Sequence, residues 1–282
     1  MDDEIQFNKL IRSALAEDIG NGDHSTLATI DGSAKGTAVL KVKEDCIIAG
    51  MEVARKIFNL LDSNASFQPS VIDGEEMLKG TIAFEINTSI HTILSAERLV
   101  LNCMQRMSGI ATLTRSYVNK LKGFHTKLLD TRKTTPNFRL LEKEAVRIGG
   151  GLNHRFGLYD MIMLKDNHID YAGGIKFAIE RSVEYIKKNN LDLQIEVEAR
   201  NLNDVEIILT TGGIKRIMLD NFSPDLLKEA LILIDKKFET EASGNINLQN
   251  LEEYASTGVD YISSGAIIHQ AKSVDLSLKA KK

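Results

Sequence analysis

The stretch LQIEVEARNLNDVEIILTTGGIKRIMLD, residues 193–220, decides the fold class. Its segments 193–198 and 216–220 are predicted to be short buried strands, and the segment over 202–210 between them has helical spacing. The last four strands begin about 22 residues apart, the length of one strand–loop–helix–loop unit. Continuous apolar strands that alternate with helices predict an α/β fold with parallel strands, either a doubly wound sheet or a (β/α) barrel. The expected strands span residues 127–130, 160–165, 193–198, 216–220, 238–243 and 261–264.

Polar or glycine residues lie at the end of each of these strands, and their distribution helps to decide between the two folds. In a barrel the carboxyl ends of the strands meet at one mouth, whereas an open sheet concentrates function at one switch point. Polar side chains at the ends of all six strands therefore favour a barrel. Because only six strands are evident in the sequence, a complete eight-stranded barrel is not expected. These ends are Asp130 to Lys133, Lys165 to His168, Glu198, Asp220 to Asn221, Ser243 to Gly244 and Ser263 to Gly265.

The first hundred or so residues have a mixed α and β pattern instead. An opening helix is expected before Gly20, with strands over 37–43 and 81–86 and an amphipathic helix over 51–61. From 89 to 121 the pattern is helical, and its interruption at Ser108–Gly109 marks the predicted change of domain.

Composition narrows the class of protein. The 282 residues include 35 Lys and Arg against 39 Asp and Glu, a formal charge of −4. This mild acidity argues against a general nucleic-acid binder, but a pocket for a small anion needs only local positive charge. No apolar run approaches the roughly 18 residues of a spanning helix, and the acidic N-terminus lacks a signal-peptide core. With only Cys46 and Cys103, no disulfide framework is expected, so we expect a soluble cytoplasmic protein.

Cationic side chains gather after the first two barrel strands. Adjacent Arg132 and Lys133 offer an anion a planar fork and a compact point charge, although a solvated loop is an open alternative. His154 and Arg155 follow a triple-glycine turn, and Lys165 ends the strongly apolar run 161–164. These residues predict an anion-binding pocket.

Carboxylates stand opposite the cations at later strand ends. Alternation places Glu196 and Glu198 on the same side of their strand, and Asp220 ends the next one. Such carboxylates suit Mg²⁺, ribose hydroxyls or a cationic transition state. Internal ion pairing with the nearby Arg and Lys is the alternative at this point.

The loops after the last two strands complete the predicted pocket. Ser243–Gly244–Asn245 and Ser263–Ser264–Gly265 occupy the place where barrels favour phosphate. The pocket should therefore bind a polyanion that carries a sugar phosphate. The sequence has no HxxxH or Cys-His metal spacing and no Gly-x-Ser-x-Gly motif, which argues against a zinc hydrolase and a serine hydrolase.

In these segments the chain resembles the quinolinate phosphoribosyltransferase family, in unbroken order from the first helix to about residue 270. Departures are small: Asp23 to Thr26 replaces a usual Asp-(Ile/Leu)-Thr, and Asn137 stands where glycine is common. The motifs that carry the resemblance are Leu15 to Gly20 with Gly22–Asp23, Glu97–Arg98 through Ser108 to Ala111, Asp130 to Pro136, Ala145 to Arg155, Lys165 to His168, Glu196 to Glu198, Leu219 to Asn221 and Glu241 to Gly244.

The resemblance implies a two-domain enzyme. An N-terminal α/β sandwich is expected over residues 1–112, with 270–282 returning to it, and an incomplete, seven-stranded α/β barrel over 113–269. The implied reaction joins quinolinate to phosphoribosyl pyrophosphate with Mg²⁺ and gives nicotinate mononucleotide, pyrophosphate and CO₂, a step of de novo NAD synthesis. Family members are typically homodimers with an arginine shared across the interface, and by motif this arginine is Arg98.

The resemblance also implies a role for each site residue. The two quinolinate carboxylates should be held by Arg132, His154, Arg155 and Arg98 of the partner subunit. The residues implied to be catalytic are Lys133 and Lys165, between quinolinate and the phosphates, and Glu198 and Asp220, which face the ribose. Glu198 and Asp220 should also hold Mg²⁺, mostly through water and pyrophosphate. The 5′-phosphate should be seated by Ser243, Gly244, Ser264 and Gly265.

Two alternatives stay open. One is a sister enzyme on the same scaffold, either a nicotinate-using phosphoribosyltransferase or a molybdenum-associated paralogue. Arg98, His154 and Arg155 together favour a dicarboxylate over the monocarboxylate nicotinate. The other alternative is a catalytically silent sugar-phosphate-binding protein, which has no need to keep the carboxylates Glu198 and Asp220 beside phosphates.

Overall fold

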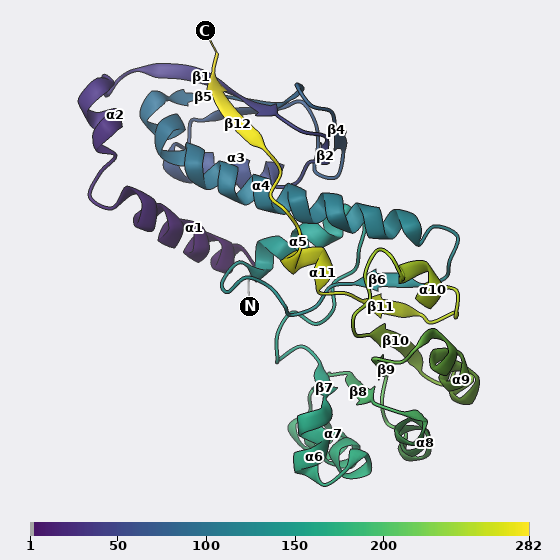
Figure 1. Cartoon of the computed structure of the whole chain (residues 1–282). Coiled ribbons are helices and arrows are strands. Elements are labelled where there is room, and N and C mark those ends of the chain that lie inside the picture. Colours follow the sequence, from purple (N-terminus) through teal and green to yellow (C-terminus); the bar gives the residue numbers. More distant parts are fainter. Residues whose placement is uncertain (1–2, 282) are drawn as a thin grey trace. The chain divides into compact units, whose positions relative to one another are not determined.

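The computed structural model describes residues 3–281, which form two compact units (Figure 1). Within the described residues, the first unit comprises the chain up to residue 115, residues 134–150 and residues from 267 onward. The second unit comprises residues 116–133 and 151–266. Residues 134–150, which lie within the expected barrel range 113–269, belong to the first unit.

The first unit is built around a four-stranded antiparallel sheet in the order β12-β1-β5-β3. β12 pairs along β1 from Ala38↔Ala280 to Val42↔Leu276, so the end of the chain lies in the first sheet (Figure 1). The strands of the unit are β1 (Lys35–Val42), β2 (Cys46–Ile47), β3 (Ser66–Pro69), β4 (Glu76–Met77), β5 (Ile82–Ser89) and β12 (Leu276–Ala280). Its helices include α1 (Asp3–Ile19), α2 (His24–Thr29), α3 (Met51–Leu61) and α5 (Arg139–Gly149).

Helix α4 (Ile90–Lys120) corrects one expectation, because it runs unbroken through Ser108–Gly109. The two small residues serve packing instead. A Cβ at Gly109 would lie 2.0 Å from the carbonyl oxygen of Lys272, in the segment that leads to β12. The buried Ser108 hydroxyl accepts a hydrogen bond from the Ala49 N–H over 3.0 Å. The residues that suggested a helix break therefore allow two backbone segments to approach the helix closely.

The second unit contains a six-stranded parallel sheet in the order β6-β11-β10-β9-β8-β7. An isolated parallel bridge joins Leu129 of β6 to Leu152. The resemblance implies a seventh strand. Within the described residues, this single bridge at Leu152 is the pairing found next to β6 on the side away from β11. The strands are β6 (Lys127–Leu129), β7 (Ile162–Leu164), β8 (Ile195–Ala199), β9 (Arg216–Asp220), β10 (Glu239–Ser243) and β11 (Tyr261–Ser263).

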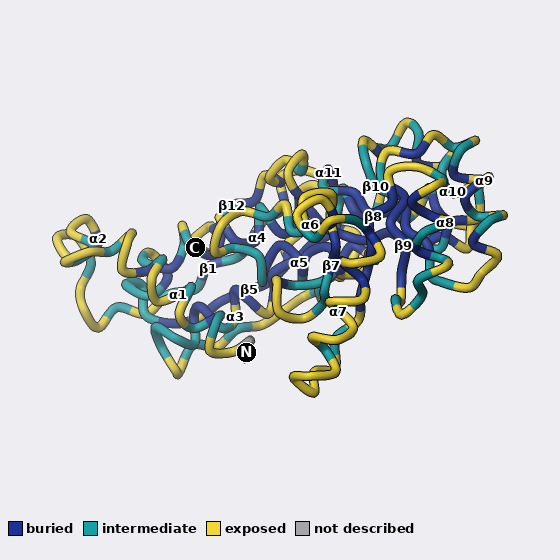
Figure 2. Tube along the Cα trace, turned by 90° about the horizontal axis from the view of Figure 1, so that it is seen from below, coloured by how far each residue is buried: buried dark blue, intermediate teal, exposed yellow. Residues whose placement is uncertain are grey.

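Helices alternate with these strands, as the sequence predicts. Asn201 and Ser223 cap α8 and α9 by accepting N–H groups of the first turn, and Pro224 begins α9. The strands are largely buried and the helices keep exposed faces (Figure 2). The helices are α6 (Asp166–Ala172), α7 (Ile175–Asn189), α8 (Leu202–Thr211), α9 (Pro224–Ile234) and α10 (Leu251–Ala255), and α11 (Ala266–His269) follows β11. No helix within residues 3–281 combines the length and hydropathy that a membrane span requires.

Candidate active site

The carboxyl ends of three neighbouring strands bring Lys165, Glu198 and Asp220 together. Lys165 directly follows β7, Glu198 lies in β8, and Asp220 ends β9 in register with Ser243 of β10. The Lys165 Nζ lies 3.0 Å from Glu198 Oε2, with the carboxylate nearly buried and the ammonium group half exposed. The parallel register therefore gathers three of the four predicted catalytic residues.

The surroundings of Asp220 disfavour the ionised form of its carboxyl group. Burial raises its pKa, and the negative charge of Glu198 raises it further, while Lys165 opposes the shift. The Asn221 Nδ2 donates to Asp220 Oδ2 over 2.7 Å. Two carboxylates that repel each other, both with hard oxygen donors, have the chemistry that suits Mg²⁺. The residues present thus fit the cation that the resemblance implies.

The loop after β10 depends on glycine. Gly244 has a φ of +98°, and a Cβ there would lie 2.2 Å from Asn221 Oδ1. The Asn221 N–H donates to the Ser243 carbonyl over 2.8 Å, and Asn245 Nδ2 donates to Asn221 Oδ1 over 3.3 Å. Asn221 and Asn245 also adopt positive φ values. The backbone after Ser243 is therefore folded tightly against Asn221, with Gly244 required at the closest approach.

The loop after β11 has different contacts. Ser264 is buried, its hydroxyl donates to the Ile246 carbonyl over 2.9 Å, and its N–H donates to the Leu129 carbonyl over 3.1 Å. These two donors are used by the fold itself. Gly265 is half-buried and follows directly. Of the four residues that the resemblance assigns to phosphate, Ser264 is thus bonded to the end of β6 and to the loop after β10.

Arg132 and Arg155 carry two positive charges in the loops after β6 and before β7. Burial lowers the pKa of Arg155, and the positive charge of Arg132 lowers it further. The Arg155 Nη1 donates to the Met161 carbonyl over 3.1 Å. The Arg132 Nε is buried and has no hydrogen-bond partner among the described residues. Lys133 is exposed next to them, and its N–H donates to the Thr131 hydroxyl. An anion bound here would relieve the repulsion between the two arginines.

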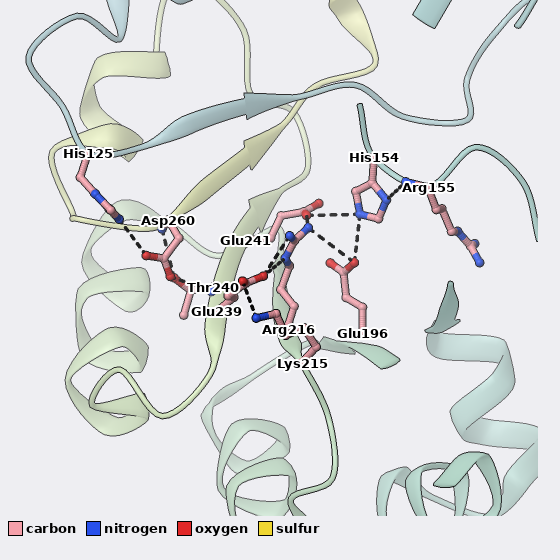
Figure 3. Close-up of polar contacts among 10 residues, drawn as sticks. All are labelled: His125, His154, Arg155, Glu196, Lys215, Arg216, Glu239, Thr240, Glu241 and Asp260. Atoms are coloured by element: carbon pink, nitrogen blue, oxygen red, sulfur yellow. Dashed lines mark hydrogen bonds and ion pairs between the residues drawn. The ribbon is translucent and has the colours of Figure 1, made fainter. Parts of the chain in front are cut away.

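His154 is buried against the carboxylates of Glu196 and Glu241 (Figure 3). Its side chain is 4% exposed, and Nε2 lies 2.9 Å from Glu196 Oε2 and 3.3 Å from Glu241 Oε2. Its Nδ1 accepts the Arg155 N–H over 2.6 Å. Both ring nitrogens therefore contact protein groups, whereas the resemblance assigns His154 to a substrate carboxylate.

A buried cation lies behind these two glutamates. The Arg216 Nη1 is 3.1 Å from Glu241 Oε2 and 3.9 Å from Glu196 Oε2, and its Nη2 is 3.0 Å from Glu239 Oε2 (Figure 3). The guanidinium also lies 4.1 Å from the centre of the Tyr261 ring. Sequence reasoning missed this network. The sequence did contain a signal for this network. Arg216, Glu239 and Glu241 are charged residues in strands that were expected to be buried, and Glu239 and Glu241 are two residues apart and therefore lie on the same side of their strand.

His154, Glu196 and Glu241 have the composition of a metal site, since three ligand atoms lie within 4.8 Å of one another. Arg216 already supplies positive charge to both carboxylates. Glu196 and Glu241 are fully buried, and burial with the neighbouring Glu241 charge raises the pKa of Glu196. We therefore treat this cluster as an internal ion-pair network, distinct from the carboxylates at the mouth.

Arg98 belongs to the first unit. It is exposed on α4. Nearby in the same unit, Arg106 pairs with the fully buried Glu142, 2.8 Å from Nη2 to Oε1. Glu142 also accepts the Thr135 N–H over 2.8 Å. This pair anchors the chain just after the Arg132–Lys133 loop.

Comparisons with known families identify the chain's relatives. The model of the quinolinate phosphoribosyl transferase C-terminal domain matches residues 110–279, and that of the N-terminal domain matches residues 23–108. A Nicotiana tabacum protein named quinolinate phosphoribosyltransferase [decarboxylating] 1b is 43% identical over 285 residues, 96% of this chain and 81% of that protein. The chloroplastic nicotinate-nucleotide pyrophosphorylase [carboxylating] of Arabidopsis thaliana is 44% identical over the same shares.

Solved structures agree with these sequence relatives. The crystal structure of NadC from Streptococcus pyogenes is 39% identical and has a TM-score of 0.91, covering 99% of this chain and 98% of that one. The match extends over both units, so the two-domain α/β fold expected from the sequence is confirmed.

Proposed function

The chain belongs to the quinolinate phosphoribosyltransferase family, and from that premise we propose that it makes nicotinate mononucleotide in NAD biosynthesis. It transfers phosphoribosyl from phosphoribosyl pyrophosphate to quinolinate and releases pyrophosphate and CO₂. The observation that carries this proposal is the buried Arg132 Nε, which has no hydrogen-bond partner among the described residues and suits an anionic substrate. The neighbouring Lys165, Glu198 and Asp220 suit a phosphorylated sugar.

The site residues divide the two substrates between them. The quinolinate carboxylates are held by Arg132, His154, Arg155 and Arg98 of the partner subunit. Lys133 and Lys165 lie between quinolinate and the phosphates. The ribose is faced by Glu198 and Asp220, and the 5′-phosphate is seated by the loops that contain Ser243, Gly244, Ser264 and Gly265.

The reaction needs no protein nucleophile. The pyridine nitrogen attacks C1′ while the bond from C1′ to the pyrophosphate oxygen breaks. Positive charge that builds on the ribose is stabilised by the carboxylates of Glu198 and Asp220. The nitrogen becomes cationic, so the electron pair left on C2 when CO₂ departs is stabilised beside it, and C2 then takes a proton from solvent. The protein contributes mainly position and preorganised charge.

Mg²⁺ is part of the proposal. Glu198 and Asp220 would hold it, mostly through water and pyrophosphate, because they are the two mutually repelling carboxylates at the mouth. When bound, the ion supplies positive charge that stabilises the leaving pyrophosphate.

We also propose a homodimer with shared active sites. Arg98 is exposed on α4 and by motif is the arginine that family members contribute to the neighbouring site.

Cytoplasmic location stays a prediction, since the Arabidopsis relative is described as chloroplastic and one tobacco relative as mitochondrial.

One assay tests the activity. Purified protein is incubated with phosphoribosyl pyrophosphate, Mg²⁺ and either quinolinate or nicotinate, and CO₂ and the nucleotide are measured. We expect equal amounts of CO₂ and nicotinate mononucleotide from quinolinate and no nucleotide from nicotinate. Turnover of nicotinate would make the chain a sister enzyme. Binding of quinolinate without turnover would make it a silent binding protein.

A further inference from the structure

Asn221 links two parts of the candidate active site. It directly follows Asp220 at the end of β9, and both ends of its side-chain amide are used. Its Nδ2 donates to Asp220 Oδ2 over 2.7 Å, and its Oδ1 accepts a hydrogen bond from Asn245 Nδ2 over 3.3 Å. One amide therefore joins the carboxylate of Asp220 to the loop after β10.

The backbone of Asn221 holds this amide in place. Its N–H donates to the Ser243 carbonyl over 2.8 Å, next to the parallel pairing of Asp220 with Ser243. Asn221 has a φ of +57°, a left-handed conformation that asparagine adopts more readily than most residues because its short side chain bonds to nearby groups. Glycine is the residue that accepts this conformation without any side chain.

The loop after β10 is shaped to receive the Asn221 amide. Gly244 brings the loop so close that a Cβ there would lie 2.2 Å from Asn221 Oδ1 and 2.6 Å from Asn221 Cγ. Asn245 is also left-handed, with a φ of +54°, and its carbonyl accepts a hydrogen bond from Asn250 Nδ2 over 3.2 Å. The amide therefore packs against the glycine on one side of the loop, while Asn250 holds the other side.

We propose that Asn221 is a positioning residue that sets the separation between the Asp220 carboxylate and residues 243–245, which we call the phosphate loop. A ribose 5-phosphate group carries its hydroxyls and its phosphate at a nearly constant distance, so it binds well only where both partners are held at matching places. The inference rests on the proposed function, which gives the ribose to Asp220 and the 5′-phosphate to the phosphate loop. It adds a residue to which the resemblance implies no role.

The substitution Asn221→Gly removes the amide and keeps the left-handed backbone. We expect it to raise the dissociation constant of ribose 5-phosphate about tenfold and to leave that of quinolinate near the wild-type value. Isothermal titration calorimetry with each ligand alone measures both constants. Asn190→Gly is the matched control, because Asn190 is an exposed asparagine of the second unit, with a φ of +50° at the end of α7. It should change neither dissociation constant.

A second substitution separates positioning from direct contact with the ligand. Asn245→Gly removes the loop side of the link and keeps the hydrogen bond between Asn221 and Asp220. If Asn221 positions the phosphate loop, Asn245→Gly should raise the ribose 5-phosphate dissociation constant about fivefold. Added to Asn221→Gly, it should have little further effect, since residues that act through one another are not additive. A direct contact made by Asn221 would leave Asn245→Gly without effect and would overturn the proposal.

The remaining outcomes distinguish this proposal from the function beneath it. Equal weakening of ribose 5-phosphate and quinolinate by Asn221→Gly would show a merely structural role, and full additivity of the two substitutions would show two independent contacts. Either result overturns the positioning role while the wild type stays active. If Asn221→Gly fails to fold, Asn245→Gly decides alone, because an unchanged ribose 5-phosphate constant in that variant contradicts the link. A wild type that converts no quinolinate would overturn the proposed function, and this inference would fall with it.

Discussion

Arg132 is a residue whose polar group a bound anion would satisfy. Its buried Nε has no hydrogen-bond partner among the described residues, and its charge lowers the pKa of Arg155. A substrate carboxylate would supply both a partner and the missing negative charge. A charge-assisted hydrogen bond of this kind contributes about 1.5–3 kcal/mol.

Arg132→Ala should therefore lower kcat/KM for quinolinate by roughly 10- to 150-fold while the protein stays folded. Steady-state kinetics measure the loss of kcat/KM, and the thermal unfolding midpoint shows whether the variant stays folded. Arg147→Ala is the matched control, because Arg147 is an exposed arginine of the first unit that pairs with Glu144 of the same helix α5. Wild-type turnover in Arg132→Ala would remove Arg132 from the site.

Asp220 makes a second prediction at the scale of one residue. If Asp220 and Glu198 hold Mg²⁺ through water and pyrophosphate, Asp220→Asn should raise the Mg²⁺ concentration needed for half-maximal activity by about tenfold or more. The measurement is product formation across a Mg²⁺ titration at fixed substrate concentrations. Asp225→Asn serves as the control, since the Asp225 side chain is 92% exposed on α9. An unchanged Mg²⁺ dependence in Asp220→Asn would exclude this carboxylate from the metal site.

At the scale of elements, the strands of the second unit could be predicted because they are short and recur at a regular spacing, and because runs such as those of β7 and β9 are apolar. The repeat near residues 193–220 indicated parallel strands, and β8 and β9 lie where it predicts them. The polar strand ends also had a local signal, since Lys165 and Asp220 each follow an apolar run. Local patterns of this kind need no knowledge of distant segments.

Features that depend on distant segments were not predictable in the same way. Gly109 looked like a helix break, because its packing partner Lys272 lies far along the chain. Arg216 looked like an ordinary strand start, because its charge is balanced by glutamates of two other strands, Glu196 and Glu241. Residues 134–150 join the first unit through contacts such as that between Arg106 and Glu142.

Gly109→Ala tests the packing explanation for the unbroken helix α4. Alanine favours a helix interior over glycine by about 1 kcal/mol, so a purely helical role predicts stabilisation. The added Cβ would instead meet the Lys272 carbonyl at 2.0 Å, and overpacking of this kind costs about 1–3 kcal/mol. We expect a net loss of stability in chemical denaturation. Gly32→Ala, where a Cβ meets nothing within 4 Å, should not lose stability. Stabilisation by Gly109→Ala would show that the close approach is unimportant.

For the molecule as a whole, the formal charge of −4 and the cationic site are compatible because they refer to different places. Exposed charges are screened beyond about 8 Å at physiological salt, so the net charge says little about a pocket. The second unit contains the four site cations Arg132, Lys133, Arg155 and Lys165 and the two site carboxylates Glu198 and Asp220.

The family and the two-domain fold predicted from the sequence are confirmed, whereas the residue roles and the dimer stay predictions.

Shared active sites make a prediction that only the whole assembly can test. Chains with Arg98→Ala and chains with Lys165→Ala should each be nearly inactive as homodimers, because every site lacks one cation. In a hybrid dimer, the site built on the Arg98→Ala chain keeps its own Lys165 and receives an intact Arg98 from the other chain. Co-expression with two affinity tags and purification through both should therefore yield hybrids with about half the wild-type activity. Sites contained within single chains would leave the hybrid as inactive as its parents, because each site would still lack one of the two residues.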